Sequence, residues 1–258
     1  MKRWPQAPSH RALRVWTRHL VQYRSFYLAE WAGNLGEHFL YLLAFGYGLG
    51  RLIPFLEGLT YAQFIGPGLV VSIAMWSSSY ESTYGAYSRM RISRTYEAML
   101  SAPLSVGDVI LGDLLWAATR ALIGATLMMI VLAFFGLIGS LWGLAALPVV
   151  FLEGLMFASL GIMAAALAPS YAFFNFHFSV VVMPMFFFAG TFFPLKGLPH
   201  WVQVFSSVLP LTHAVKLVRG LIIYGRADDA AWHLFVLLAF TAVFFAAACA
   251  VISRRLVD

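Results

Sequence analysis

A segment at the end of the first third of the chain carries aromatic and hydroxyl side chains at intervals of four residues. Ser72, Trp76, Tyr80 and Tyr84 share one face of a helix at this spacing, and Glu81 lies next to that face. Aromatic rings stack on apolar ring faces, and hydroxyl or carboxylate groups hydrogen bond to sugar hydroxyls. The pattern therefore favours contact with a molecule that is part sugar and part lipid. Ordinary packing between helices explains any single ring equally well.

Two charged residues lie deep within apolar segments. Arg120 stands about eleven residues from one end of its segment and Glu153 about fourteen from the matching end of the next, depths of roughly 17 and 21 Å. Charges inside a bilayer are costly and are usually paired or in contact with water. We expect Arg120 and Glu153 to form an ion pair between adjacent antiparallel helices; contact of these charges with a bound substrate, or no pair at all, are the alternatives.

The composition indicates an integral membrane protein. Apolar residues make up 61% of the 258 residues and charged residues 11%, against roughly 45–50% and about 25% in soluble domains. The net charge is +6, and the charged residues lie mostly at the ends of apolar segments. Such placement sets the topology of a membrane protein and argues against a nucleic-acid partner. The single cysteine, Cys249, leaves no disulfide framework within one chain.

The chain contains six apolar segments, each long enough to span a membrane with roughly 20 residues. The aromatic, hydroxyl and charged side chains described above lie in these segments. We predict an all-α membrane protein of one domain, residues 1–258, in which a basic amphipathic helix, about 10–30, lies in the membrane interface before the first span; a solvated tail is the alternative. The predicted spans are about 32–51, 64–85, 109–135, 143–167, 173–191 and 231–252.

The distribution of lysine and arginine predicts the orientation. With six spans, eleven of these residues fall on one side and five on the other, which places both termini and the loop after the second span in the cytoplasm. The eleven are Lys2, Arg3, Arg11, Arg14, Arg18, Arg24, Arg89, Arg91, Arg94, Arg254 and Arg255, and the five are Arg51, Lys196, Lys216, Arg219 and Arg226.

Residues 190–229 form a connection that is too long for a turn and too apolar for an ordinary loop. Prolines divide it into two short helices, about 198–208 and 211–224, with Pro210 at the bend. Apolar helices of this length between spans are often re-entrant or interfacial. We expect an extracytoplasmic re-entrant hairpin over about 195–224, with Lys216 and Arg219 facing the outer headgroups; a plain interfacial hairpin is the alternative.

The sequence lacks the motifs of a self-sufficient enzyme or pump. It contains no G-x-x-x-x-G-K-[ST] loop for a nucleotide, no G-x-S-x-G motif, and no His/Cys/Asp/Glu cluster with metal-ligand spacing. We therefore expect no metal site, no cofactor bound by this chain and no catalytic residues. Energy for transport would come from an ion gradient or from another protein.

Two long stretches carry a resemblance to a known family. They are RTYEAMLSAPLSVGDVILGDLLWAATRA (94–121) and GTFFPLKGLPHWVQVFSSVLPLTHAVKLVRGL (190–221). With the predicted arrangement of spans, the chain resembles an ABC-2 type permease, and more closely the nodulation protein J (NodJ) subfamily, over nearly its whole length. The resemblance implies a homodimer in the bacterial inner membrane with two copies of a separate NodI-like ABC ATPase, which binds ATP and Mg. It also implies export of an amphipathic lipo-oligosaccharide or glycolipid, with a polysaccharide, another lipid or a drug as alternatives.

The resemblance also implies roles for particular residues. Residues 94–102 would form a coupling helix that docks in a groove of the ATPase; a helix that lies passively on the lipid is the alternative. The implied docking residues are Arg94, Thr95, Tyr96, Glu97, Met99 and Leu100. In the resembled fold the second and fifth spans line the pathway, which adds Asn175, Phe186 and Phe187 to the face of the second span. Phe188, Phe192 and Phe193 would form a hydrophobic outer gate.

A different class of function remains open on the residues alone. A stand-alone secondary transporter or channel could use Asp113, Glu81 or His177 to carry protons. The two halves of the chain show no self-similarity, which weakens this interpretation. A membrane-embedded enzyme would need a catalytic cluster that the sequence does not show.

Overall fold

The computed structural model describes residues 8–53 and 55–257, with side chains described as far as Ile252. Lys2, Arg3 and the side chains of Arg254 and Arg255, which entered the topology argument, lie outside the described part. The helices and strands are α1 (Ala12–Tyr23), α2 (Tyr27–Tyr41), β1 (Phe55–Leu56), β2 (Leu59–Thr60), α3 (Tyr61–Tyr80), α4 (Thr95–Leu100), α5 (Val106–Phe134), α6 (Ala146–Leu167), α7 (Ala172–His177), α8 (Met183–Phe188), α9 (His200–Val208), α10 (Pro210–Arg219) and α11 (Ala230–Val257).

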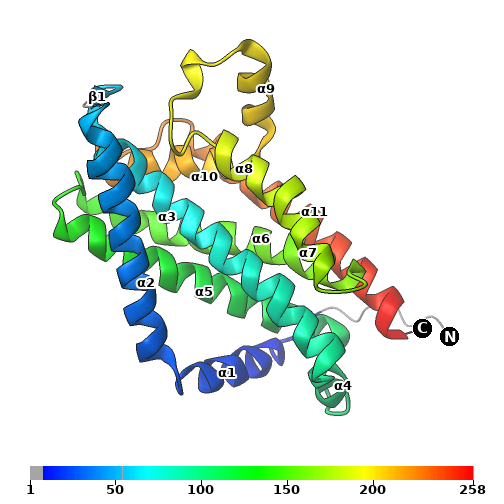
Figure 1. Cartoon of the computed structure of the whole chain (residues 1–258). Coiled ribbons are helices and arrows are strands. Elements are labelled where there is room, and N and C mark those ends of the chain that lie inside the picture. The colour runs from blue at the N-terminus through cyan, green and yellow to red at the C-terminus, as the bar shows by residue number, and fades with distance from the viewer. Residues whose placement is uncertain (1–7, 54, 258) are drawn as a thin grey trace.

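Four long helices pack together around α6. α6 packs against α3, α5 and α11, and α3 also packs along α5. α2 crosses these helices on one side, while α1 and α4 lie at one end and the β1–β2 hairpin and α9 at the other (Figure 1). The predicted all-α architecture is confirmed in this coarse sense.

Several helices are long and apolar enough to cross a membrane. Among the described residues these are Val106–Phe134, Leu141–Leu167 and Ala230–Ile252, and the bent pair α9–α10 could form a fourth span. The segments expected at about 32–51, 64–85 and 173–191 are helical as well. They contain polar side chains or π-helical turns, so the count of six spans stays a prediction.

The predicted interface helix over 10–30 is wrong in its extent. The helix ends at Tyr23 and a new one begins at Tyr27, because Phe26 takes a φ of −139° and leaves the helical conformation. The buried face of α1 consists of Ala12, Val15, His19 and Tyr23, and it packs on α5. The basic helix is therefore fastened to a membrane-spanning helix and does not rest on lipid alone.

The predicted helical hairpin is present, with α9 and α10 meeting at 88° and Pro210 at the start of α10. The expectation for Arg219 is wrong, because its side chain turns inward. The guanidinium donates to the carbonyl of Gly190 at 2.8 Å and lies 4.0 Å from the centre of the Phe64 ring. The carbonyl groups of Phe64 in α3 and of Gly190 after α8 accept from the arginine, whereas Lys216 stays exposed.

Beyond Tyr80 the helix α3 continues as two π-helical segments, η3 (Glu81–Gly85) and η4 (Ser88–Ile92). α6 approaches η3 closely, because a Cβ atom on Gly161 would lie 2.0 Å from Ser82 Oγ. Wide π-helical turns are rare and often occur at functional sites. These segments connect α3 with α4.

Candidate functional site

A cavity of about 1020 Å³ lies between α2, α3, α5 and α8. Its lining residues combine aromatic rings with carboxylates and hydroxyl groups. They are Glu30, Asn34, Glu37, His38, Tyr41, Phe45, Leu49, Ile53, Tyr61, Leu69, Ser72, Ile73, Trp76, Ser77, Tyr80, Glu81, Gly85, Arg120, Gly124, Met183, Phe186, Phe187, Phe192 and Phe193. This volume falls at the upper end of ligand sites, which are mostly apolar with a few placed polar groups.

The aromatic wall of the cavity is built by α3 and the segment α7–α8. Trp76 stacks on Tyr80 with ring centres 5.6 Å apart and on Phe178 at 5.5 Å. Phe186 meets Trp76 edge to face at 5.9 Å. The spacing of four residues predicted on α3 thus produces a continuous ring surface.

Most of the residues predicted for the pathway reach this cavity. Ser72, Trp76, Tyr80, Glu81, Phe186 and Phe187 line it. Two of the predicted residues do not line it. Tyr84 lies further along, stacked on Tyr171 at 6.0 Å, and Asn175 is exposed on α7.

The phenylalanines predicted for the outer gate separate into two groups. Phe192 and Phe193 line the cavity, and the Phe192 ring contacts Phe186 at 5.1 Å and Phe45 at 5.8 Å. Phe188 instead meets Phe205 of α9 edge to face at 5.7 Å. The cavity is therefore bounded at this end by two of the three predicted rings.

The predicted ion pair between Arg120 and Glu153 is wrong. Arg120 forms an ion pair with Glu30 of α2, and both side chains are about one-fifth exposed in the cavity wall. Glu153 is 0% exposed, and neither carboxyl oxygen has a hydrogen-bond partner among the described residues. Similar depth along neighbouring helices was not sufficient to predict the partner of Arg120. Its side chain points toward α2, where Glu30 lies, and does not reach Glu153.

Sequence reasoning missed the contribution of α2 to the cavity. Glu30, Asn34, Glu37, His38 and Tyr41 all line it. Their spacing of three and four residues places them on one face of a helix. This polar stripe in an otherwise apolar segment was the signal that could have found them.

The segment 94–102, predicted to be a coupling helix, is helical over Thr95–Leu100 (α4), and its coupling role stays a prediction. Arg94 and Glu97 are exposed, and Thr95 and Leu100 are half-buried. Tyr96 and Met99 were expected to make apolar contacts with an ATPase, and this expectation is wrong. These two side chains are 0% and 8% exposed and face the interior of the chain.

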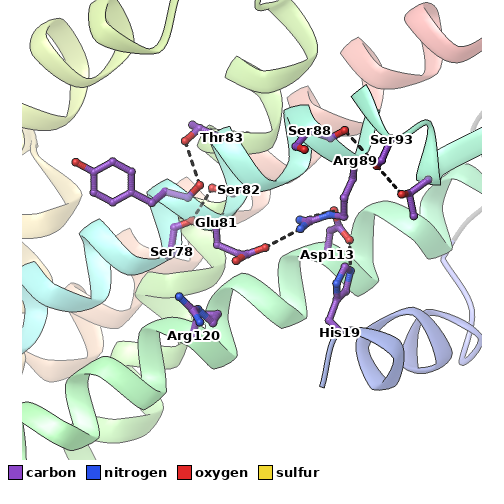
Figure 2. A network of polar contacts seen from close by, with 12 residues as sticks. His19, Ser78, Glu81, Ser82, Thr83, Ser88, Arg89, Ser93, Asp113 and Arg120 are labelled. Carbon is purple, nitrogen blue, oxygen red and sulfur yellow. Dashed lines mark hydrogen bonds and ion pairs between the residues drawn. The ribbon is translucent and has the colours of Figure 1, made fainter. Parts of the chain in front are cut away.

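Tyr96 is buried because its hydroxyl belongs to a network of polar groups, here called the Asp113 network: His19, Glu81, Arg89, Tyr96 and Asp113. Asp113 accepts from the Tyr96 hydroxyl at 2.5 Å, and His19 Nε2 lies 2.6 Å from its other oxygen. Figure 2 shows Arg89 between Asp113 and Glu81. Arg89 Nη2 is 3.0 Å from Asp113 and its Nη1 is 2.8 Å from Glu81.

The charges in the Asp113 network keep both Arg89 and Tyr96 protonated. Burial disfavours the charged guanidinium, but the carboxylates of Asp113 and Glu81 outweigh this effect and raise the pKa of Arg89. Burial and the charge of Asp113 raise the pKa of Tyr96 well above its ordinary value. Arg89 therefore stays charged, and the Tyr96 phenol stays protonated and donates its hydrogen bond.

Comparison with known proteins places the chain in a family. The model of the ABC-2 type transporter family matches residues 12–223, so the chain belongs to this family of membrane transporters. It is 38% identical over 242 residues to nodulation protein J of Bradyrhizobium diazoefficiens, covering 94% of this chain and 92% of that protein. It is 37% identical to nodulation protein J of Rhizobium meliloti with the same coverage.

A more distant relative is the inner membrane transport permease YadH of Escherichia coli, 25% identical over 81% of this chain and 77% of that protein. No solved structure matches the chain. The resemblance to the ABC-2 permeases and to their nodulation protein J subfamily is thus confirmed, and the chain is a multi-pass transport subunit of the membrane.

Proposed function

We propose that this chain is the permease half of an ATP-driven exporter that moves an amphipathic lipo-oligosaccharide or glycolipid out across the inner membrane. The observation that carries this proposal is the large cavity between α2, α3, α5 and α8. Its rings can stack on sugars and contact acyl chains, while Glu37, Ser77 and Glu81 offer hydrogen-bond partners to sugar hydroxyls. The similarity to nodulation protein J supports the same substrate class.

The proposed assembly is a homodimer with two copies of a separate NodI-like ATPase that binds ATP and Mg. Membership of the ABC-2 family supports an ABC ATPase as partner. Both termini and α4 would lie in the cytoplasm, on the side that the excess of lysine and arginine indicates.

The docking surface for the ATPase would be the exposed face of α4 and the end of η4. Arg94 and Glu97 offer charged contacts there. Ile92, which is 65% exposed, offers the apolar contact that the buried Tyr96 and Met99 cannot make. An exposed apolar side chain beside complementary charges is a common composition for a protein interface.

The test is co-expression with the ABC ATPase encoded beside this chain, purification through a tag on this chain, and measurement of ATP hydrolysis in lipid. The wild-type chain should co-purify with an active ATPase. Glu97→Lys should reduce the amount of co-purified ATPase by at least about tenfold, because a reversed charge opposes complementary groups at an interface. The readout is the ratio of the two subunits on a gel.

The matched control is Asp228→Lys, the same kind of charge reversal at a side chain that is 89% exposed in the loop before α11. It should leave the subunit ratio unchanged. The proposal is contradicted if no ATPase co-purifies with the wild-type chain, and decisively so if the purified chain alone moves a solute with a proton gradient. That result would favour a secondary transporter.

A further inference from the structure

A continuous line of polar contacts joins α4 to the cavity. It begins at the Tyr96 hydroxyl, which donates to Asp113, and passes through Arg89, which donates to both Asp113 and Glu81. Glu81 is itself a lining residue of the cavity. Figure 2 shows the part of this line from Asp113 to Glu81, with Arg89 bridging the two carboxylates and Arg120 lying apart from them.

The contacts at the Asp113 end of this line are strong and shielded from water, whereas the side chains of Arg89 and Glu81 are 15% and 16% exposed. Asp113 is 1% exposed, and Arg89 meets one of its oxygens through both Nε and Nη2 at 3.1 and 3.0 Å. Hydrogen bonds between charged groups are roughly twice as strong as neutral ones, and the planar guanidinium fixes their geometry. Water cannot reach the buried carboxylate of Asp113 to replace the Tyr96 hydroxyl. If Tyr96 is displaced, we therefore expect Asp113 or Arg89 to move with it.

The backbone around Glu81 and Arg89 is shaped to allow their contact. Gly85 lies between them in η3, and a Cβ atom there would be 2.8 Å from Glu81 Oε1 and 3.1 Å from Arg89 Nη1. The absence of a side chain at this position leaves the path of the ion pair open. Gly85 is the last residue of η3, and the π-helical turns of η3 and η4 separate α3 from α4.

We infer that Tyr96, Asp113 and Arg89 transmit movement of α4 to Glu81, so that the carboxylate offered to a ligand in the cavity changes with the nucleotide state of the ATPase. This inference rests on the proposed function and deepens it. In this arrangement α4 has two roles on two faces. Its exposed Glu97 binds the ATPase, and its buried Tyr96 carries the movement inward.

The experiment measures the cavity directly in the complete complex with the ATPase. Cys249→Ala removes the native thiol, and Ser77→Cys places a single thiol in the cavity wall, four residues from Glu81. The labelling rate of this thiol by a maleimide is compared in the nucleotide-free and ATP–vanadate-trapped complexes. In the parent we expect the two rates to differ by roughly fivefold or more, a typical size for coupling between distant sites.

Tyr96→Phe and Gly85→Ala test the line at its two ends, and both should bring the ratio of the two rates close to one. The ATPase should still co-purify with Tyr96→Phe, because the lost hydroxyl is buried. The matched control is Tyr87→Phe, which removes a nearby hydroxyl that donates to the carbonyl of Pro169 at 3.2 Å and takes no part in the line. It should keep the parent ratio.

The outcomes separate this inference from the proposed function. If the complex forms and hydrolyses ATP but Tyr96→Phe and Gly85→Ala keep the parent ratio, the inference is wrong and the exporter proposal stands. It is also wrong if the parent shows no nucleotide-dependent change, or if Tyr87→Phe abolishes it too. Failure of any ATPase to join the wild-type chain overturns both. If only one of the variants Tyr96→Phe and Gly85→Ala folds, its ratio of labelling rates decides whether the inference holds.

Discussion

Two buried carboxylates on neighbouring helices differ in nearly every contact. Asp113 of α5 is 1% exposed and meets His19, Arg89 and Tyr96 from three other segments of the chain. Glu153 of α6 is 0% exposed, and no described residue hydrogen bonds to its carboxyl group. A buried charge without partners is costly, whereas one with several donors can be held in the ionised form. Depth of burial alone therefore does not reveal what an acidic residue does.

The backbone next to each carboxylate explains this difference. Gly112 precedes Asp113 and lets α1 come so close that a Cβ atom would lie 2.4 Å from that of Val15. Gly154 follows Glu153 and lets α6 approach α5 so closely that a Cβ atom added at Gly154 would lie 3.0 Å from the Cα atom of Ala118. The first close approach brings His19 of α1 to the carboxylate of Asp113. The second brings Ala118 and Ala121 of α5 next to Gly154, and neither side chain can hydrogen bond to Glu153.

The largest effect should come from Asp113→Asn. This change removes the charge that holds Arg89 and leaves buried donors without an ionised partner, so we expect a loss of about 3–5 kcal/mol in the free energy of unfolding. Unfolding of the purified chain in mixed detergent micelles, followed by circular dichroism, measures it. A loss below about 1 kcal/mol would show that the Asp113 network contributes little to stability.

Gly112→Ala should have an intermediate effect, a loss of about 1–3 kcal/mol, because the added methyl group forces α1 away from α5. The control is Gly33→Ala on α2, where an added Cβ atom would meet nothing within 4 Å. The same unfolding measurement compares the two variants. Equal stability of both would contradict the close α1–α5 contact, and with it the position of His19.

The smallest effect concerns Arg120, whose ion pair with Glu30 is partly exposed in the cavity. A double-mutant cycle with Arg120→Gln and Glu30→Gln should give a coupling free energy of about 1 kcal/mol, typical of a pair that water can reach. The matching cycle of Arg120→Gln with Glu153→Gln should give none. Coupling to Glu153 in place of Glu30 would restore the pair predicted from the sequence and contradict the structure.

The parts of the site that follow a single helix could be predicted from the sequence. Ser72, Trp76, Tyr80 and Glu81 reach the cavity because residues four apart on one helix share a face and Glu81 adjoins it. The helix α4 and the bend at Pro210 were predicted because turn residues and proline act locally. These signals do not depend on what the helix packs against.

The parts that depend on how helices are rotated against one another could not be predicted. Arg120 and Glu153 lie at similar depths, but depth does not state which neighbour a face meets. Tyr96 and Met99 looked like a surface for a partner and proved to be buried. His19 was not singled out in the sequence, because its contact with Asp113 forms only where α1 packs against α5.

By itself, the sequence determined that this protein is helical, resides in the membrane and belongs with the ABC-2 permeases, because composition, helical periodicity and two long family-specific stretches are properties of the chain alone. Only the tertiary structure decided that Glu30 pairs with Arg120 and that Asp113 joins α1, α4 and α5. Side chains far apart in the sequence meet only after close helix contacts have fixed the rotation of each helix. Glycines such as Gly112 and Gly85 permit those contacts, because an added Cβ atom would lie 2.4 Å from Val15 at the first and 2.8 Å from Glu81 at the second.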